Sequence, residues 1–318
     1  MPLAPDAQAY VDDALAFMKA EGAPYYRDAP LMRAREINWD RAVQQRGPIR
    51  DPARISDIVV PTRAGERPAK LVRPSGVSST AIDVPLILYF HGGGYVIGGL
   101  DESLSEAVRL ADRVGGIVIS FSYRLAPEHP FPAFLEDGLD AFAWVRAQAD
   151  GLGADRRRIG LAGCSAGAGL AAAVARSRLQ TQEEGPRALY LMTPWLDLTF
   201  STDTVKAAFA ALGRPTDLQW FAACATAGGA AAADPLLSPA LHPAPAGYPP
   251  TIILTAGEDF LRTEAYLFAD HVAASGAVVD RFEAVGMPHA YHVYVNLMPT
   301  GKPTLDQADA AFKQRLID

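Results

Sequence analysis

The chain is poor in cysteine, with Cys164 and Cys224 as its two residues of that type among 318. Two cysteines, one of them inside a glycine-flanked turn, do not make a disulfide framework. The sequence also has no run of 18 or more apolar residues, so we expect no membrane span. Residues 1–7 have neither a basic start nor an apolar core, so we expect no signal peptide and a cytoplasmic location.

The chain has fewer basic than acidic residues. The sequence has 29 lysines and arginines against 36 aspartates and glutamates, a formal net charge of −7. This balance argues against nucleic acid or an anionic membrane as the main partner. Hydrophobic residues make up 49% of the chain, which is enough for a large buried core. We find no internal repeat.

Strand-like and helix-like segments alternate along most of the chain. The strand-like runs lie near 85–90, 117–123, 158–162, 188–193, 251–256 and 278–284. The helical patterns between them lie near 103–114, 134–149, 166–180 and 261–275. Before them, residues 55–62 and 67–73 predict an antiparallel hairpin. Ser103 and Glu106 predict a capping box at the first of the helices. The alternation predicts an α/β fold with a mostly parallel sheet flanked by helices.

The pentapeptide GCSAG at 163–167 stands between a strand-like run and a helical run. This context predicts a tight strand-to-helix turn that presents the hydroxyl of Ser165 as a nucleophile at the end of the sheet. Upstream, HGGG at 91–94 ends the strand-like run 85–90. Its glycines leave backbone N–H groups unobstructed, which suits the binding of a developing oxyanion.

With a serine nucleophile of this kind, an acid and a base follow in chain order. Asp259 and His289 each follow a strand-like run, at the strand ends where open α/β sheets bind their ligands. Glu258 is a rival acid, because either carboxylate can serve. His292 is a rival base or half of a metal pair, but H-x-x-H without further ligands is weak evidence for zinc. We therefore expect no metal.

Two further aspartates compete for the role of the acid. Asp234 is followed by proline, which is typical of a turn. Asp197 is the other of the two. The pattern of the residues alone leaves the choice of the acid open.

These motifs resemble the hormone-sensitive-lipase-like branch of the α/β-hydrolases, the bacterial carboxylesterases with an HGGG box. The resemblance covers nearly the whole chain beyond the N-terminal segment. The other motifs that carry it are YRLAPEHPFPA (123–133), PWLDL (194–198), DPLLSP (234–239), GEDFL (257–261) and GMPHAY (286–291). It implies an α/β-hydrolase fold with a helical cap. It also implies a serine carboxylesterase that needs no cofactor and acts on short- to medium-chain esters through an acyl-enzyme.

Carried over by position, the resemblance implies that Ser165 is the nucleophile, His289 the base and Asp259 the acid that orients it. The implied oxyanion hole consists of the backbone N–H groups of Gly93, Gly94 and Ala166. The implied partners are a small-molecule ester and water.

Two segments stand outside the strand–helix alternation. Residues 1–50 contain two helical stretches, and residues 199–233 form an alanine-rich insertion. The resemblance implies that both segments meet above the site as a cap, with 51–198 and 234–318 as the catalytic domain. Four side chains of the insertion are candidates for the acyl pocket: Phe209, Leu212, Trp220 and Phe221.

Cys164 is the main departure from the family, which commonly has an acid or a threonine before the serine. We expect its thiol to be buried behind Ser165 and to take no part in the chemistry. Amide or lactone hydrolysis by the same residues stays open, as does a homodimer. A non-catalytic ligand-binding protein on the same fold is the alternative of another class.

Overall fold

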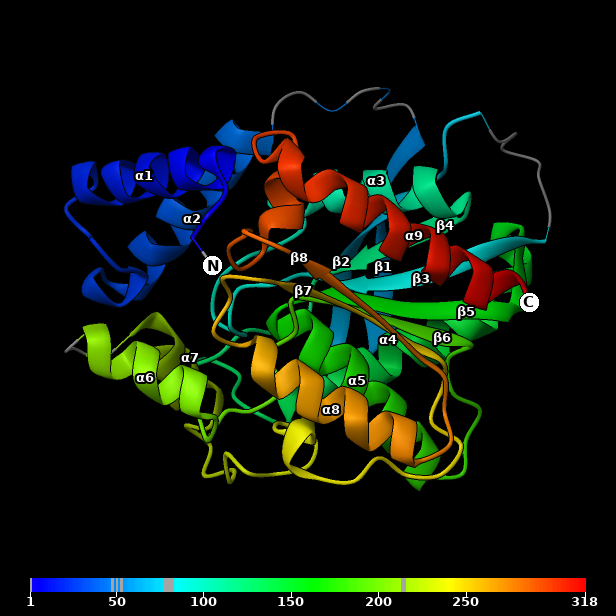
Figure 1. The fold of residues 1–318 in the computed structure, drawn as a ribbon. Coiled ribbons are helices and arrows are strands. Elements are labelled where there is room, and N and C mark those ends of the chain that lie inside the picture. Colours follow the sequence, from blue (N-terminus) through cyan, green and yellow to red (C-terminus); the bar gives the residue numbers. More distant parts are fainter. Residues whose placement is uncertain (1, 47–48, 50, 52–53, 77–82, 213–215) are drawn as a thin grey trace.

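The computed structural model describes residues 2–46, 49, 51, 54–76, 83–212 and 216–318 (Figure 1). Its strands are β1 (Ile55–Thr62), β2 (Gly65–Val72), β3 (Val84–Phe90), β4 (Ile117–Phe121), β5 (Ala154–Cys164), β6 (Ala188–Met192), β7 (Thr251–Ala256) and β8 (Val279–Ala284). Over the described residues they form one sheet in the order β1-β2-β4-β3-β5-β6-β7-β8. The β1–β2 and β2–β4 pairs are antiparallel and the others are parallel. The predicted hairpin and the mostly parallel sheet are confirmed.

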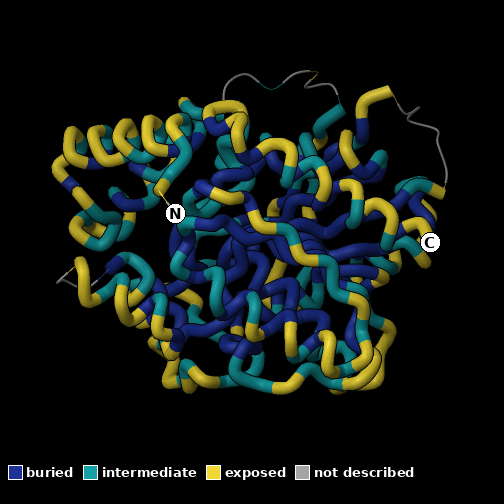
Figure 2. Tube along the Cα trace, in the orientation of Figure 1, coloured by how far each residue is buried: buried dark blue, intermediate teal, exposed yellow. Residues whose placement is uncertain are grey.

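Helices cover both faces of this sheet. On one face lie α3 (Leu104–Val114) and α9 (Lys302–Ile317), and on the other α4 (Ala133–Leu152), α5 (Ala166–Gln180) and α8 (Arg262–Ala274) (Figure 1). The central strands β3, β4, β6 and β7 are buried between them, whereas β1 and the outer sides of the helices are partly exposed (Figure 2). None of the helices in the described ranges combines the length and the hydropathy that crossing a membrane requires.

β3 shows why the central strands are apolar at nearly every position. Leu86, Leu88 and Phe90 join the core beneath α4, α5 and α8, while Ile87 and Tyr89 join the core beneath α3 and α9. Successive side chains of a strand point to opposite faces of the sheet. A strand that is covered on both faces therefore needs apolar side chains throughout, and its sequence reads as a continuous run.

The capping box predicted at the start of α3 is wrong. The hydroxyl of Ser103 donates to the carbonyl oxygen of Gly99 at 2.8 Å, and Glu106 turns into the interior, where Tyr89 and His292 engage its carboxylate. A capping box forms instead at α7 (Asp217–Ala225), where the N-cap is Thr216.

α9 is the helix that the strand–helix alternation did not locate, because it follows the last strand. Its buried residues recur at three- and four-residue spacing, which is the pattern of an amphipathic helix. They are Leu305, Ala308, Asp309, Phe312 and Leu316. The ring of Phe312 packs against that of Tyr190 in β6, with centroids 5.2 Å apart. α9 thus closes the core on its face of the sheet.

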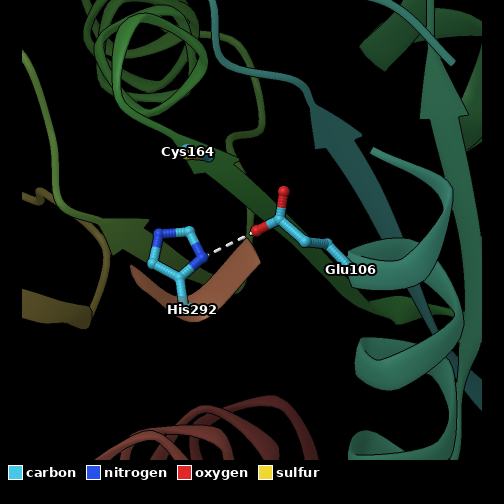
Figure 3. Close-up of side chains that lie close together, drawn as sticks. All are labelled: Glu106, Cys164 and His292. Atoms are coloured by element: carbon cyan, nitrogen blue, oxygen red, sulfur yellow. Dashed lines mark hydrogen bonds and ion pairs between the residues drawn. The ribbon is translucent and has the colours of Figure 1, made fainter. Parts of the chain in front are cut away.

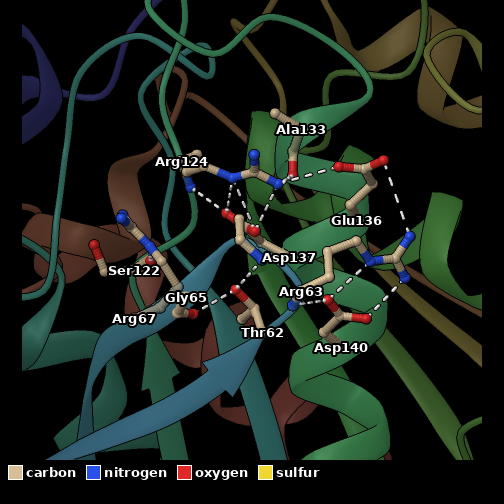
Figure 4. Close-up of polar contacts among 11 residues, drawn as sticks. Thr62, Arg63, Gly65, Arg67, Ser122, Arg124, Ala133, Glu136, Asp137 and Asp140 are labelled. Carbon is tan, nitrogen blue, oxygen red and sulfur yellow. Dashed lines mark hydrogen bonds and ion pairs between the residues drawn. The ribbon is translucent and has the colours of Figure 1, made fainter.

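The turn of the β1–β2 hairpin is held against α4 by ion pairs (Figure 4). Arg63 donates to Asp140 from its Nε (3.0 Å) and its Nη2 (2.8 Å). Arg124 donates to Asp137 from its backbone N–H (2.8 Å) and its Nε (3.0 Å). The first pair holds the hairpin turn against α4, and the second holds the segment that follows β4 against the same helix.

The helices of the two predicted cap segments lie toward the same end of the sheet (Figure 1). They are α1 (Pro5–Ala20) and α2 (Leu31–Arg46), with the short 3-10 helix η1 (Tyr26–Asp28) between them, and α6 (Asp203–Leu212) and α7. The backbone N–H of Arg27 donates to Asp217 at 3.0 Å and so joins the two segments. Residue 50, where the first segment was expected to end, and residues 213–215 of the second lie outside the described residues.

We expect Phe312→Leu to lower the free energy of unfolding by about 1–3 kcal/mol, because the smaller side chain leaves a cavity against Tyr190. Urea denaturation followed by tryptophan fluorescence measures the loss. An unchanged midpoint would show that α9 does not belong to the cooperative core.

Candidate active site

Ser165 is the single residue between the end of β5 and the start of α5. Its φ is 53° and its ψ is −118°, a conformation that residues other than glycine rarely adopt. The turn depends on Gly167, because a Cβ there would collide with the carbonyl oxygens of Phe90 and His91. The chain is thus forced to turn sharply at the carboxyl end of β5, with the serine side chain at the tip.

The loops after β7 and β8 bring Asp259 and His289 to this serine. Nε2 of His289 lies 2.9 Å from the hydroxyl oxygen of Ser165, and its Nδ1 lies 2.6 Å from Oδ2 of Asp259. Asp259 is buried, and its Oδ1 accepts a hydrogen bond from the backbone N–H of Leu261 at 2.9 Å. The three side chains therefore form one continuous hydrogen-bonded chain.

The rival residues have other partners. Asp197 accepts hydrogen bonds from Thr199 and Ser201, and Asp234 accepts one from the backbone of Leu236. His292 is buried and hydrogen bonds to Glu106 and Thr193. Of the adjacent carboxylates Glu258 and Asp259, it is Asp259 that meets His289.

The protein around His289 sets its pKa. Desolvation by the surrounding chain lowers the pKa of the imidazole, but the charge of Asp259 and the hydrogen bond to it outweigh this effect and leave the pKa above its ordinary value. The protonated imidazole therefore persists to a higher pH than in a free histidine.

Three backbone N–H groups near Ser165 have no hydrogen-bond acceptor among the described residues, namely those of Gly93, Gly94 and Ala166. Ala166 is the first residue of α5, where the helix leaves its N–H groups unpaired and partially positive. A Cβ at Gly94 would collide with the ring of Phe221, so the glycine loop lies directly against α7.

A cavity of about 440 Å³ lies in front of Ser165 and His289. Of the four side chains predicted for the acyl pocket, Phe221 lines it, and so does the nearby Leu218. Phe209, Leu212 and Trp220 are not among its lining residues.

These three side chains lie elsewhere in the inserted segment. Phe209 packs between the rings of Phe200 and Phe260. Leu212 is 45% exposed, and the ring of Trp220 lies against Phe221 with centroids 5.2 Å apart. The sequence identified the inserted segment as a source of cavity residues, but it could not show which side of each helix faces the cavity.

Residues 1–50 supply much of the remaining wall, and the sequence analysis named none of them. The lining residues from this segment are Tyr10, Val11, Ala14, Leu15, Tyr26, Asn38, Arg41 and Ala42. The guanidinium of Arg41 lies 5.2 Å from the ring centroid of Tyr10 and 5.8 Å from that of Tyr294. This segment thus gives the cavity both apolar and polar lining residues.

The burial predicted for Cys164 is confirmed, since the residue is 3% exposed. Burial raises the pKa of its thiol well above the ordinary value. A thiol that stays protonated is a poor nucleophile.

We expect Asp259→Asn to lower the pKa of His289, because the substitution removes the charge that opposes desolvation. An NMR titration of the histidine ring signals measures the shift. Asp197→Asn is the matched control, since Asp197 is also a buried carboxylate but contacts Thr199 and Ser201. Equal pKa values in the wild type and the Asp259 variant would contradict the stated cause.

Comparison with known proteins places this geometry in a family. The family model Abhydrolase_3, described as the alpha/beta hydrolase fold, matches residues 87–293. Carboxylic ester hydrolase LipN of Mycobacterium tuberculosis is 36% identical over 78% of this chain and 66% of its own. Ethyl acetate hydrolase of Pseudomonas putida is 33% identical over 76% of each chain.

The solved structure of an ester hydrolase from the metagenome of Lake Arreo, in complex with a bipyridine phosphonate derivative, is 30% identical to this chain. The two structures superpose with a TM-score of 0.89 over 98% of each chain. The chain therefore belongs to the hormone-sensitive-lipase-like family of α/β-hydrolases and is a carboxylic ester hydrolase.

Proposed function

We propose that the protein hydrolyses short- to medium-chain carboxylic esters through an acyl-enzyme on Ser165. The observation that carries this proposal is the hydrogen-bonded chain from Asp259 through His289 to Ser165, with steps of 2.6 and 2.9 Å. A serine hydroxyl is a weak nucleophile at neutral pH and needs an adjacent base.

In the proposed first step, Nε2 of His289 takes the proton of Ser165 as its oxygen attacks the ester carbonyl carbon. Asp259 holds the imidazole by its Nδ1–H and stabilises the imidazolium that forms. His289 then gives the proton to the departing alcohol. Water repeats the sequence at the acyl-enzyme and releases the carboxylic acid.

The backbone N–H groups of Gly93, Gly94 and Ala166 are proposed to bind the oxyanion of each tetrahedral intermediate. Their lack of partners among the described residues supports this role, because preorganised donors need no rearrangement when charge develops. The aligned peptide dipoles of α5 add to the stabilisation at Ala166.

Residues 1–50 and 199–233 are proposed to act as a cap over a catalytic domain formed by 51–198 and 234–318. The bond from Arg27 to Asp217 supports this division, and so do the lining residues that both segments give to the cavity. A cap that covers the reacting groups excludes water and strengthens the electrostatic interactions there.

The preference for short and medium acyl chains is proposed from the cavity. Its volume of about 440 Å³ is at the lower end for small-molecule sites. The lining includes the apolar side chains of Leu218 and Phe221 but also polar groups such as Arg41. A long alkyl chain beside Arg41 would remove water from a polar group without replacing its hydrogen bonds, which is unfavourable. The ethyl acetate hydrolase among the relatives also supports a short acyl group. Hydrolysis of esters is favoured over amides or lactones because LipN is named for carboxylic esters.

We expect Ser165→Ala and His289→Ala each to lower the turnover of 4-nitrophenyl butyrate by about 10⁴-fold or more, because residues of such a unit act together. A phosphonate ester should label Ser165 in the wild type, as peptide mass spectrometry detects. If Ser165→Ala kept more than a tenth of the activity, the assigned nucleophile would be wrong.

We expect Phe221→Ala to shift the preference toward longer acyl chains, because it removes a ring from the cavity wall. Values of kcat/KM for 4-nitrophenyl esters from acetate to laurate measure the shift, which should be about 10-fold in the ratio of long to short chains. Leu212→Ala is the control, since Leu212 is exposed and outside the cavity. Equal profiles for both variants would remove Phe221 from the acyl pocket.

A further inference from the structure

A second acid–histidine pair lies beside Cys164, the residue that precedes Ser165. Nδ1 of His292 is 2.7 Å from Oε1 of Glu106, and both side chains are buried (Figure 3). Glu106 comes from α3, and His292 from the short helix η4 (Tyr291–Tyr294). Cys164, the last residue of β5, completes the cluster, since the polar atoms of all three residues lie within 4.8 Å of one another. The proposed reaction assigns no role to this pair.

Each polar atom of the pair has a partner. The hydroxyl of Tyr89 donates to Oε2 of Glu106 at 2.7 Å, and Nε2 of His292 lies 3.2 Å from the hydroxyl oxygen of Thr193. The thiol of Cys164 lies within 4.8 Å of the nearest polar atoms of Glu106 and His292. A hydrogen-bonded path therefore runs from Glu106 through His292 to Thr193, and Cys164 lies beside it. A buried network in which every polar group has a hydrogen-bond partner holds its members in one arrangement.

The contacts of Glu106 favour its carboxylate form. Burial alone would raise the pKa of Glu106, but its contacts with His292, Tyr89 and Arg109 outweigh burial and lower the pKa. Breaking such a buried pair leaves an uncompensated charge, which is strongly unfavourable. The Glu106–His292 pair therefore links α3 to η4 through an interaction that is costly to break.

Two residues of the network lie close in sequence to residues that react in the proposed mechanism. Cys164 immediately precedes Ser165, and His292 follows His289 by three residues. The segment that carries Thr193 also braces the turn, because the carbonyl oxygen of Met192 accepts the N–H of Ser165 at 3.0 Å. The network thus spans the two backbone segments that fix the distance between Ser165 and His289.

We propose that Glu106 and His292 are positioning residues, which hold His289 and the turn of Ser165 at reacting distance through Thr193 and Cys164. This inference rests on the proposed function, because it assigns the pair a role in bringing the nucleophile and its base together. Small displacements of reacting groups lower rates strongly, by about 100-fold for 1 Å.

The test uses Glu106→Gln, His292→Asn and His292→Gln in the full chain. The Asn amide nitrogen can replace Nδ1 and keep the bond to Glu106, whereas the Gln amide reaches toward Thr193 instead. We expect kcat for 4-nitrophenyl butyrate to fall about 10- to 100-fold in Glu106→Gln and His292→Gln, and less in His292→Asn. KM should stay within about twofold in the His292 variants, since His292 does not line the cavity. Titration with a phosphonate ester counts the active sites, so that unfolded molecules do not enter kcat.

A double-mutant cycle separates a pair from two independent residues. If Glu106 and His292 act together, Glu106→Gln combined with His292→Gln should lower kcat little more than either change alone. Phe312→Leu is the control for general destabilisation, because Phe312 belongs to the same core on that face of the sheet. It should leave kcat per active site unchanged.

Three results would overturn the inference. The first is a wild-type kcat in both Glu106→Gln and His292→Gln. The second is a loss of kcat in Phe312→Leu that matches theirs at equal loss of stability. The third is inactivation of the wild type by dialysis against 1,10-phenanthroline, which would make the cluster a metal site. Failure of the proposed function would look different, since Ser165→Ala would then retain its turnover.

Discussion

The strained turn at Ser165 is the feature around which the site is built. A non-glycine residue with a positive φ costs on the order of 1–3 kcal/mol, so surrounding contacts must hold it. The backbone of Ser165 donates to Met192 and accepts from Trp195, at 3.0 and 3.1 Å. α5 then runs flush against the sheet, because its first two turns are buried glycines, alanines and one leucine. Close packing on both sides of the turn thus keeps the hydroxyl at the edge of the sheet.

Parallel pairing explains why distant parts of the sequence meet at that edge. The strands β3, β5, β7 and β8 all end at the same side of the sheet, so the loops that follow them converge. The sequence could predict this arrangement, because each motif stands directly after an apolar run. The strand-end positions of the glycine loop, Ser165, Asp259 and His289 follow from local patterns and topology alone.

Features that depend on competition between distant side chains could not be predicted in this way. Ser103 and Glu106 have the spacing of a capping box, yet Tyr89 and His292 outcompete the helix terminus for the carboxylate. Local spacing does not show that two partners from other elements lie within reach. The same limit applies to the pocket: Phe221 and Phe209 have similar helical surroundings in sequence, and only the packing of α6 and α7 separates them.

Both of the predicted cap segments contact the glycine loop or its surroundings. Arg35 of α2 donates to the carbonyl oxygen of Val96 at 2.9 Å. It also forms a bidentate ion pair with Glu128, with N–O distances of 2.7 and 2.8 Å. On the other side, the ring of Phe221 occupies the space that a side chain at Gly94 would need. The loop that carries two of the proposed oxyanion donors is therefore held between both cap segments. In the proposed mechanism, where the oxyanion donors must be preorganised, residues that line the cavity therefore also help to hold these donors in place.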